Sequence, residues 1–291
     1  MIAVTGATGN VGRALVERLT AAHHPVRALT RDPERAGLPG SAEVVKFRPD
    51  DAAALFEGTT RLFLYVQAAG PHTPALLAAA REAGVRHVVL LSSGIIEDGA
   101  DETHPIHVMH ATAERQIRDS GLAWTFLRPN AFAANALQWA RQLRTGDTVR
   151  GVYANMVTAP IHEDDIAAVA ERTLLDDGHE GAVHRLTGPE AITTSEQIAA
   201  IGRATGRDLT FTEVPPDEAG PELFPQAPPE FVRALLKTFA DAVDVPPEIT
   251  TTVEKITGTP ARAFARWAED HAADFRKVQD AGGPGGGAGS R

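Results

Sequence analysis

The chain of 291 residues contains no cysteine, which excludes disulfide bonds, thiolate metal sites and a cysteine nucleophile. No apolar run is long enough to span a membrane, and no basic region followed by an apolar segment opens the chain. Cationic side chains are scarce too: 28 lysines and arginines stand against 38 aspartates and glutamates, for a formal net charge of -10. This charge repels phosphate backbones and anionic lipids. We therefore expect a soluble cytoplasmic protein that binds neither nucleic acid nor membranes.

The first half of the chain alternates short apolar runs with helical patterns. Helical spacing marks residues 11–22 and 74–84 and a segment that ends at Ser120 and Gly121. Apolar runs predict strands at residues 2–5, 26–29, 44–47, 61–66, 87–92 and 124–127. Strands that alternate with helices imply crossover connections and a parallel sheet. The expected fold class is therefore α/β, a doubly wound parallel (Rossmann) sheet whose ligands lie at the carboxyl ends of its strands.

The second half of the chain is less regular. It predicts a proline-rich loop at 215–229, with strands at 157–161, 183–186 and 209–214 and helices at 163–175, 195–205, 231–243, 247–256 and 260–275. We expect residues 1–155 to form the Rossmann domain, completed by 157–188, and residues 189–275 to form a smaller C-terminal α+β lobe. The glycine-rich segment 276–291 is expected to be a disordered tail.

The first strand runs into the glycine turn Gly6-Ala7-Thr8-Gly9-Asn10-Val11-Gly12, which opens an amphipathic helix. Gly6 can adopt angles that a side chain forbids, Gly9 lets a diphosphate approach the backbone, and Gly12 lets the helix pack close to the sheet. The helix N-terminus adds free N–H groups and a partial positive charge, and Asn10 adds a side-chain donor. In this context the pattern predicts a site for the pyrophosphate of NAD(P).

The end of the second strand bears on the choice between NADPH and NADH. An acidic residue there would bond to the ribose 2'-hydroxyl, whereas an arginine would pair with a 2'-phosphate. Thr30 stands where the acidic residue is expected, and Arg31 follows it. We favour NADPH held by Arg31. The alternative is that Arg31 is solvated and Asp32 serves NADH.

Four segments together resemble the NmrA-like family of atypical short-chain dehydrogenase/reductase proteins, in particular its NAD(P)H:quinone oxidoreductase-like branch. They are the glycine turn and residues 26–33, 91–94 and 120–132, and the resemblance extends over about residues 1–215. It implies an NADP-binding Rossmann domain with a small lobe that covers the substrate. By position, the residues implied to hold the dinucleotide are Gly6, Thr8, Gly9, Asn10, Val11, Gly12, Arg31, Val66, Gln67, Ser92, Ser93, Pro129, Asn130 and Phe132.

Typical short-chain dehydrogenases carry Tyr-x-x-x-Lys on the helix after the fifth strand, where the lysine activates the phenol. This chain has only two tyrosines, Tyr65 and Tyr153, and neither is followed by lysine four residues later. The corresponding helix has His110 and Glu114 on one face. One hypothesis is that His110 donates a proton to the reduced substrate and Glu114 orients and charges it. The alternative is that His110 binds substrate or faces solvent, and Glu114 is a surface carboxylate.

These observations predict an NADPH-dependent oxidoreductase that delivers hydride to a small conjugated acceptor such as a quinone or enone, as a monomer or homodimer. The first alternative is a non-catalytic NAD(P)-sensing regulatory protein, as some NmrA-like proteins are. An isomerase or epimerase ranks lower, because that chemistry usually needs the missing tyrosine. No metal site is expected: His162-Glu163-Asp164-Asp165 are consecutive, so they point in different directions, and they suit a helix start.

Overall fold

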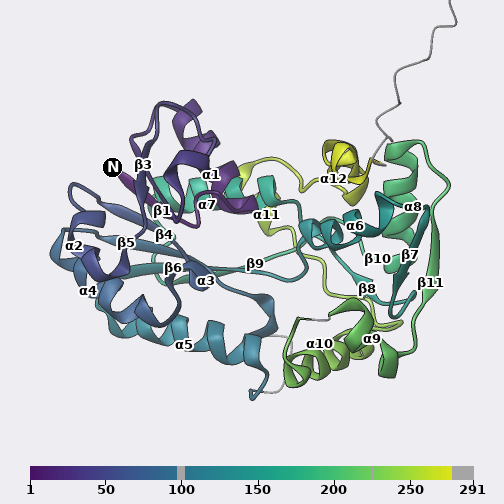
Figure 1. The fold of residues 1–291 in the computed structure, drawn as a ribbon. Coiled ribbons are helices and arrows are strands. Elements are labelled where there is room, and N and C mark those ends of the chain that lie inside the picture. The colour runs from purple at the N-terminus through teal and green to yellow at the C-terminus, as the bar shows by residue number, and fades with distance from the viewer. Residues whose placement is uncertain (97–101, 225, 277–291) are drawn as a thin grey trace, which may run out of the picture.

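The structure is a computed structural model in which residues 1–96, 102–224 and 226–276 are described. Apart from Arg276, the expected tail lies outside the described residues. Figure 1 shows two bodies side by side, a large sheet with its helices and a smaller lobe drawn mostly from the second half of the chain. No helix within the described ranges is long and apolar enough to cross a membrane.

Seven parallel strands form the main sheet, in the order β3-β2-β1-β4-β5-β6-β9. Strands β1, β2 and β5 are buried along their whole length, as expected where helices cover both faces. The predicted doubly wound parallel sheet is confirmed. The strands are β1 Ile2–Thr5, β2 Val26–Thr30, β3 Glu43–Lys46, β4 Arg61–Tyr65, β5 His87–Leu91, β6 Ala123–Pro129 and β9 Ala182–Leu186.

Helices cover the two faces of this sheet and bury a separate apolar cluster on each. One cluster joins β1 to α1 and α7, and the other joins β4 and β5 to α2, α4 and α5. Their apolar stripes at helical spacing explain why these segments fold as they do. The helices are α1 Asn10–Ala21, α2 Ala52–Leu55, α3 Val66–Ala69, α4 Thr73–Glu82, α5 Pro105–Asp119, α7 Glu163–Leu175 and α11 Thr252–Thr257.

The strand order reverses at β1. Strands β2 and β3 lie on one side of it, and β4, β5, β6 and β9 lie on the other. After β1 the chain enters α1 on one face, and after β4 it enters α3 and α4 on the opposite face. A crevice opens at the carboxyl ends of the strands where the connections diverge in this way, and doubly wound proteins bind their ligands there. The glycine turn and the segments that follow β4, β5 and β6 share this edge.

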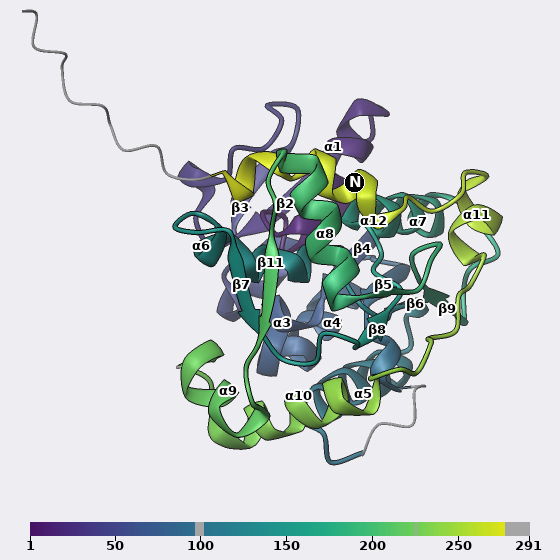
Figure 2. The ribbon, with the colours of Figure 1, turned by 90° about the vertical axis from the view of Figure 1, so that its right-hand side faces the viewer.

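The smaller lobe holds two short two-stranded sheets. Strand β7 (Thr148–Gly151) pairs in parallel with β11 (Thr210–Glu213), and β8 (Val157–Thr158) pairs antiparallel with β10 (Ile192–Thr193). Figure 2 shows α8 beside β11 and β7, with α9 and α10 below them. The helices are η5 Ala133–Trp139, α6 Ala140–Leu143, α8 Thr194–Thr205, α9 Pro216–Leu223, α10 Pro229–Asp241, α12 Phe264–Asp270 and η6 Ala272–Phe275.

The lobe differs from the sequence-based expectations in several places. The predicted loop over 215–229 contains α9, which begins with Pro216 followed by acidic residues that suit a helix N-terminus. The strand expected at 157–161 is only β8, and the helix expected at 247–256 begins at Thr252. No element was predicted at 148–151, because β7 is specified by pairing with a segment 62 residues away rather than by its own pattern.

The boundary between the two bodies also differs from the predicted division at residue 155. Buried side chains of residues 133–149 pack with α8, α12 and η6 in the core of the lobe. The chain therefore leaves the sheet after β6, builds part of the lobe, and returns through α7 to β9. The lobe contains a long segment from the middle of the chain as well as the C-terminal region.

Candidate functional site

The glycine turn between β1 and α1 owes its shape to its glycines. Gly6 has a φ of 62°, in the left-handed region that glycine favours. A Cβ on Gly6 would lie 2.8 Å from Cδ1 of Tyr65, and a Cβ on Gly12 would collide with the carbonyl oxygen of Gly6. The N–H of Gly9 donates to that same carbonyl at 2.9 Å. The turn can therefore close only if these two positions carry no side chain.

The outer side of the turn is open. Thr8, Gly9 and Asn10 are exposed, whereas the side chain of Val11 is buried, so that Val11 offers a ligand only its backbone. Gly9 is the N-cap of the 12-residue helix α1, and no side chain caps the first turn. The N–H groups in the first turn of α1 are thus available to an anion. This cradle fits the diphosphate of a dinucleotide.

The end of β2 carries the predicted phosphate-binding arginine. Arg31 is exposed and forms no ion pair within the described part of the chain. Asp32 lies 3.8 Å from Arg35. Arg13 of α1 donates to the carbonyls of Ala36 and Gly37, each at 2.7 Å, and so fixes the loop that follows Arg31. Sequence analysis missed Arg13, because its partners lie more than 20 residues away and are backbone atoms.

The end of β4 is tied to the glycine turn by Tyr65. Its N–H donates to Oγ1 of Thr5 at 2.7 Å, and its hydroxyl donates to Oε1 of Gln67 at 2.6 Å. Burial raises the pKa of Tyr65, which keeps the phenol protonated. Sequence analysis named Val66, which is buried, and Gln67, which is exposed, but it missed Tyr65. The sequence could have indicated Tyr65, because it is the last residue of the strand that lies beside the glycine turn.

Glu114 lies in the core between α5 and the sheet and is only 1% exposed. Arg128 of β6 donates to both carboxylate oxygens, at 2.9 and 2.7 Å. Ser92 donates at 2.7 Å from the end of β5, and Arg118 at 3.1 Å from the next turn of α5. Glu114 is therefore not the surface carboxylate of the second hypothesis. It joins α5 to β5 and β6, and it engages the hydroxyl of Ser92, one of the residues predicted to hold the dinucleotide.

His110 lies one turn before Glu114 and is 7% exposed, so it does not face solvent. Burial lowers the pKa of His110 to about 4, although the charge of Glu114 acts in the opposite direction. The expectation that Glu114 would charge the imidazole is therefore wrong, and His110 is neutral near pH 7. Its Nδ1 is buried and has no hydrogen-bond partner among the described residues. A role of His110 or Glu114 in turnover stays a prediction.

Two more buried polar atoms of this region lack a hydrogen-bond partner within the part of the chain that the structure describes. They are Nδ1 of His107, on the same helix, and Oδ1 of Asn130, which follows β6. Asn130 packs directly over Gly94, where a Cβ would collide with Oδ1. Buried polar atoms without a partner cost free energy unless a ligand or water satisfies them. With His110, these atoms give the ends of β5 and β6 hydrogen-bonding capacity that the described protein atoms leave unused.

The remaining predicted residues of this edge have structural contacts. The Oγ of Ser93 accepts a hydrogen bond from the N–H of Ile95 at 3.3 Å. Phe132 pairs with Ile161 where the chain passes between the two bodies. Pro129 is the buried last residue of β6. The structure thus places Ser92, Ser93, Pro129, Asn130 and Phe132 together at one edge, while the glycine turn and Arg31 stand at the neighbouring strand ends.

The segment His162-Glu163-Asp164-Asp165 forms the start of α7. Nδ1 of His162 accepts the N–H of Asp164 at 3.1 Å and caps the helix. Glu163 accepts from Nε1 of Trp267 at 2.9 Å and is 2.6 Å from Nε2 of His271, while Asp165 binds Arg262. We call this set of contacts between α7 and residues 262–271 the α7 clasp.

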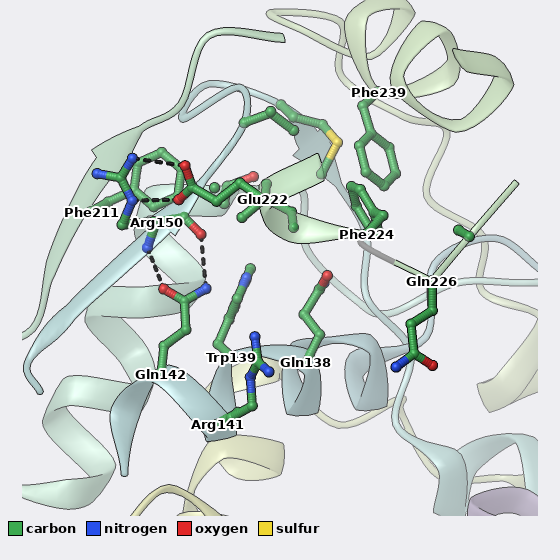
Figure 3. Close-up of a pocket in the computed structure, with 16 residues that line it drawn as sticks. Gln138, Trp139, Arg141, Gln142, Arg150, Phe211, Glu222, Phe224, Gln226 and Phe239 are labelled. Carbon is green, nitrogen blue, oxygen red and sulfur yellow. Dashed lines mark hydrogen bonds and ion pairs between the residues drawn. The ribbon is translucent and has the colours of Figure 1, made fainter. Parts of the chain in front are cut away.

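A cavity of about 660 Å³ lies within the smaller lobe, as Figure 3 shows. Its floor comes from η5 and α6, one wall comes from β7 and β11, and the ends of α9 and α10 close the other side. Trp139, Phe211, Phe224 and Phe239 line it. The volume lies within the range of small-molecule sites. No residue of the Rossmann sheet lines this cavity.

A doubly wound sheet with an open glycine turn where the strand order reverses defines an NAD(P)-binding Rossmann protein. A family model described as NAD(P)H-binding matches residues 6–177, from the glycine turn to the end of α7. The chain belongs to this NAD(P)H-binding family. The predicted resemblance to NmrA-like proteins is confirmed, and crystal structures of NmrA share the fold.

The chain is similar to known reductases over nearly its whole length. A (4-alkanoyl-5-oxo-2,5-dihydrofuran-3-yl)methyl phosphate reductase of Streptomyces griseus is 41% identical over 286 residues, covering 94% of this chain and 99% of the relative. An NAD(P)H azoreductase of Xenophilus azovorans is 33% identical with the same coverage. The structure of an NADPH-dependent quinone oxidoreductase of Escherichia coli with bound NADPH gives a TM-score of 0.76 at 24% identity, covering 93% of this chain and 99% of that one. That likeness shows the fold.

Proposed function

We propose that the protein is an NADPH-dependent oxidoreductase that reduces a small conjugated acceptor, an enone or a quinone. The observation that carries this proposal is the shared edge: an open cradle for a diphosphate lies at the same edge of the sheet as three buried polar atoms that have no partner among the described residues. The first feature suits a dinucleotide, and the second suits a polar ligand beside it. When bound, the reduced nicotinamide supplies a hydride.

The reductase relative from Streptomyces griseus supports an enone. The double bond in the ring of its substrate is conjugated with the ring carbonyl and with the alkanoyl carbonyl, so that hydride addition leaves an enolate shared by two carbonyls. That compound also carries an alkyl chain and a phosphate. The 41% identity supports a related acceptor for this chain.

Each residue at the shared edge then has a binding or positioning role. Asn10 and Val11 hold the diphosphate with their N–H groups, and Arg31 pairs with the 2'-phosphate. The neutral imidazole of His110 gives one hydrogen bond to a carbonyl oxygen of the acceptor, and Asn130 orients the ligand beside it. Glu114 acts as a positioning residue, because it holds the helix of His110 against β5 and β6.

The chemistry does not require an acid of the enzyme with a pKa near 7. An enolate shared by two carbonyls, or a hydroquinone anion, is stable enough to take its proton from water. This agrees with the pKa of His110 near 4 and with the absence of lysine four residues after either tyrosine. Saturated ketones, whose reduction leaves a strongly basic alkoxide, should not be substrates.

The test is an assay of the purified protein with NADPH or NADH and a panel of enones, quinones and saturated ketones, followed by the absorbance of the reduced cofactor. We expect oxidation of NADPH by enones or quinones only, with a higher kcat/KM for NADPH than for NADH. Tight NADPH binding without oxidation by any acceptor would contradict the proposal. It would favour the second candidate, an NAD(P)-sensing protein, for which the neutral state of His110 near pH 7 is the supporting observation.

A further inference from the structure

The cavity of the smaller lobe has a charge arrangement of its own. Three charged side chains line it among the described residues: Arg141, Arg150 and Glu222. Arg150 donates to both oxygens of Glu222, at 2.5 and 3.0 Å, so these two charges neutralise each other. Gln142 fixes this pair by accepting the N–H of Arg150 at 2.8 Å. Arg141 has no ion pair with any residue of the described chain, which leaves the cavity with one uncompensated positive charge.

Arg141 is exposed, and its guanidinium lies beside Gln138 at the floor of the cavity (Figure 3). The rest of the lining is mainly aromatic and aliphatic, with Trp139 and Phe211 on one side and Phe224 and Phe239 on the other. A cation with amide donors at one end of an aromatic chamber is complementary to an amphiphilic anion. The anionic group would bind Arg141, and an alkyl or aryl chain would contact the rings.

The cavity also lies within reach of the shared edge. The floor helix η5 begins directly after Phe132 at the end of β6 and ends at Trp139. Gln138 is six residues beyond Phe132, a separation of roughly 12 Å at the 3₁₀ rise of about 2 Å per residue. A ligand of several carbons can therefore extend from the edge into the cavity.

We propose that this cavity binds the anionic end of an amphiphilic acceptor, a phosphate or carboxylate held by Arg141, while the conjugated group lies at the ends of β5 and β6. This assignment rests on the proposed function for the position of the conjugated group. Binding of the anion depends only on the cavity. Arg141 is thus a specificity residue for the acceptor and not part of the dinucleotide site.

Calorimetric titration of the full chain with hexyl phosphate, hexanoate and hexanol tests the anion site without turnover. We expect both anions to bind and Arg141→Gln to weaken them by at least about tenfold, the loss of one charge-assisted contact. Hexanol should bind weakly and equally to both proteins. The rank of the two anions identifies phosphate or carboxylate as the preferred group. Arg144→Gln is the matched control, because Arg144 is exposed on the same segment and does not line the cavity.

Two further measurements keep the result interpretable. Arg141→Lys retains the charge and should recover part of the affinity. Added salt should weaken the anions but not hexanol in the unmodified chain, which gives an answer even if Arg141→Gln is unstable. The inference is overturned if neither anion binds, or if Arg141→Gln binds them as the unmodified chain does. Arg141-dependent binding without NADPH oxidation by any acceptor would instead refute the proposed function and leave the anion site standing.

Discussion

Glu114 shows how one residue can be misjudged from its neighbours in sequence. Its spacing from His110 suggested a pair on a helix face, but its carboxylate is turned into the core and binds Arg128, Ser92 and Arg118. Helical periodicity predicts which residues share a face of the helix. It does not predict which side chains of the neighbouring strands contact that face. The glycine turn was predictable because its chemistry is local. Arg118 lies on the same helix as Glu114, but Ser92 and Arg128 come from the ends of β5 and β6 and were not predictable in this way.

Replacing Glu114 with Ala should destabilise the fold strongly. The substitution removes the carboxylate that binds the buried guanidinium of Arg128 at two points, and breaking a buried ion pair costs about 3–5 kcal/mol. Urea denaturation should therefore show a large fall in the free energy of unfolding. Asp119→Ala, at an exposed position on the same helix, should change it by less than about 0.5 kcal/mol. An unfolding free energy unaffected by Glu114→Ala would show that the carboxylate does not hold α5 to the sheet.

His110 should affect catalysis as a neutral group. Because burial lowers its pKa to about 4, its charge does not change between about pH 5.5 and 8. In this range kcat/KM should show no inflection attributable to His110. His110→Ala should lower kcat/KM for the acceptor on the order of tenfold, the loss of one hydrogen bond in a desolvated site, with NADPH affinity unchanged. A pH-rate inflection near 6.5 that disappears in His110→Ala would restore the acid hypothesis.

At the scale of elements, the main sheet was predictable and the lobe only in part. Strands β1 to β6 are apolar runs between helical patterns, so local sequence specifies them. Strand β7 exists because it pairs with β11, and α9 lies in a segment whose prolines suggested a loop. The α7 clasp belongs to this scale as well: the sequence suggested a helix start at Glu163, but its partners Trp267 and His271 are more than 100 residues away.

The α7 clasp should make stability fall at alkaline pH. The hydrogen bond to Glu163 raises the pKa of His271 to about 9, from an ordinary value near 6.5. The folded state binds this proton more tightly than the unfolded state does. The clasp therefore contributes its full share of the free energy of unfolding below about pH 6.5, and this contribution is lost as the pH rises through about 9. Unfolding free energies measured from pH 6 to 10 should decline accordingly, and His271→Gln should flatten the decline.

A matched substitution guards against a general alkaline effect. His72→Gln changes an exposed histidine outside the clasp and should leave the decline as it is. An equal decline in His271→Gln and in the unmodified chain would mean that another group causes it.

At the scale of the whole molecule, the cofactor should act as a stabiliser of the folded state. NADPH at 100 times its Kd adds about 2.7 kcal/mol to the free energy of unfolding, provided that it binds only the folded chain. The melting temperature should therefore rise by several degrees with NADPH, and less with NADH at the same concentration. Arg31→Ser should remove most of this difference. If NADPH exceeded NADH by the same margin in the unmodified chain and in Arg31→Ser, Arg31 would not bind the 2'-phosphate. That result would favour the alternative in which Asp32 serves NADH.

The chain crosses between the two bodies repeatedly, at Phe132, at Ile161, after β9 and again around α11. The lobe is therefore an excursion from an otherwise complete nucleotide-binding sheet, attached at several points. Segment 133–158 and the C-terminal region could be exchanged for the equivalent parts of a relative. This exchange would replace the cavity of the smaller lobe and leave the glycine turn intact. This architecture allows the substrate range of such proteins to diversify by recombination of one body, while the source of reducing power is inherited unchanged.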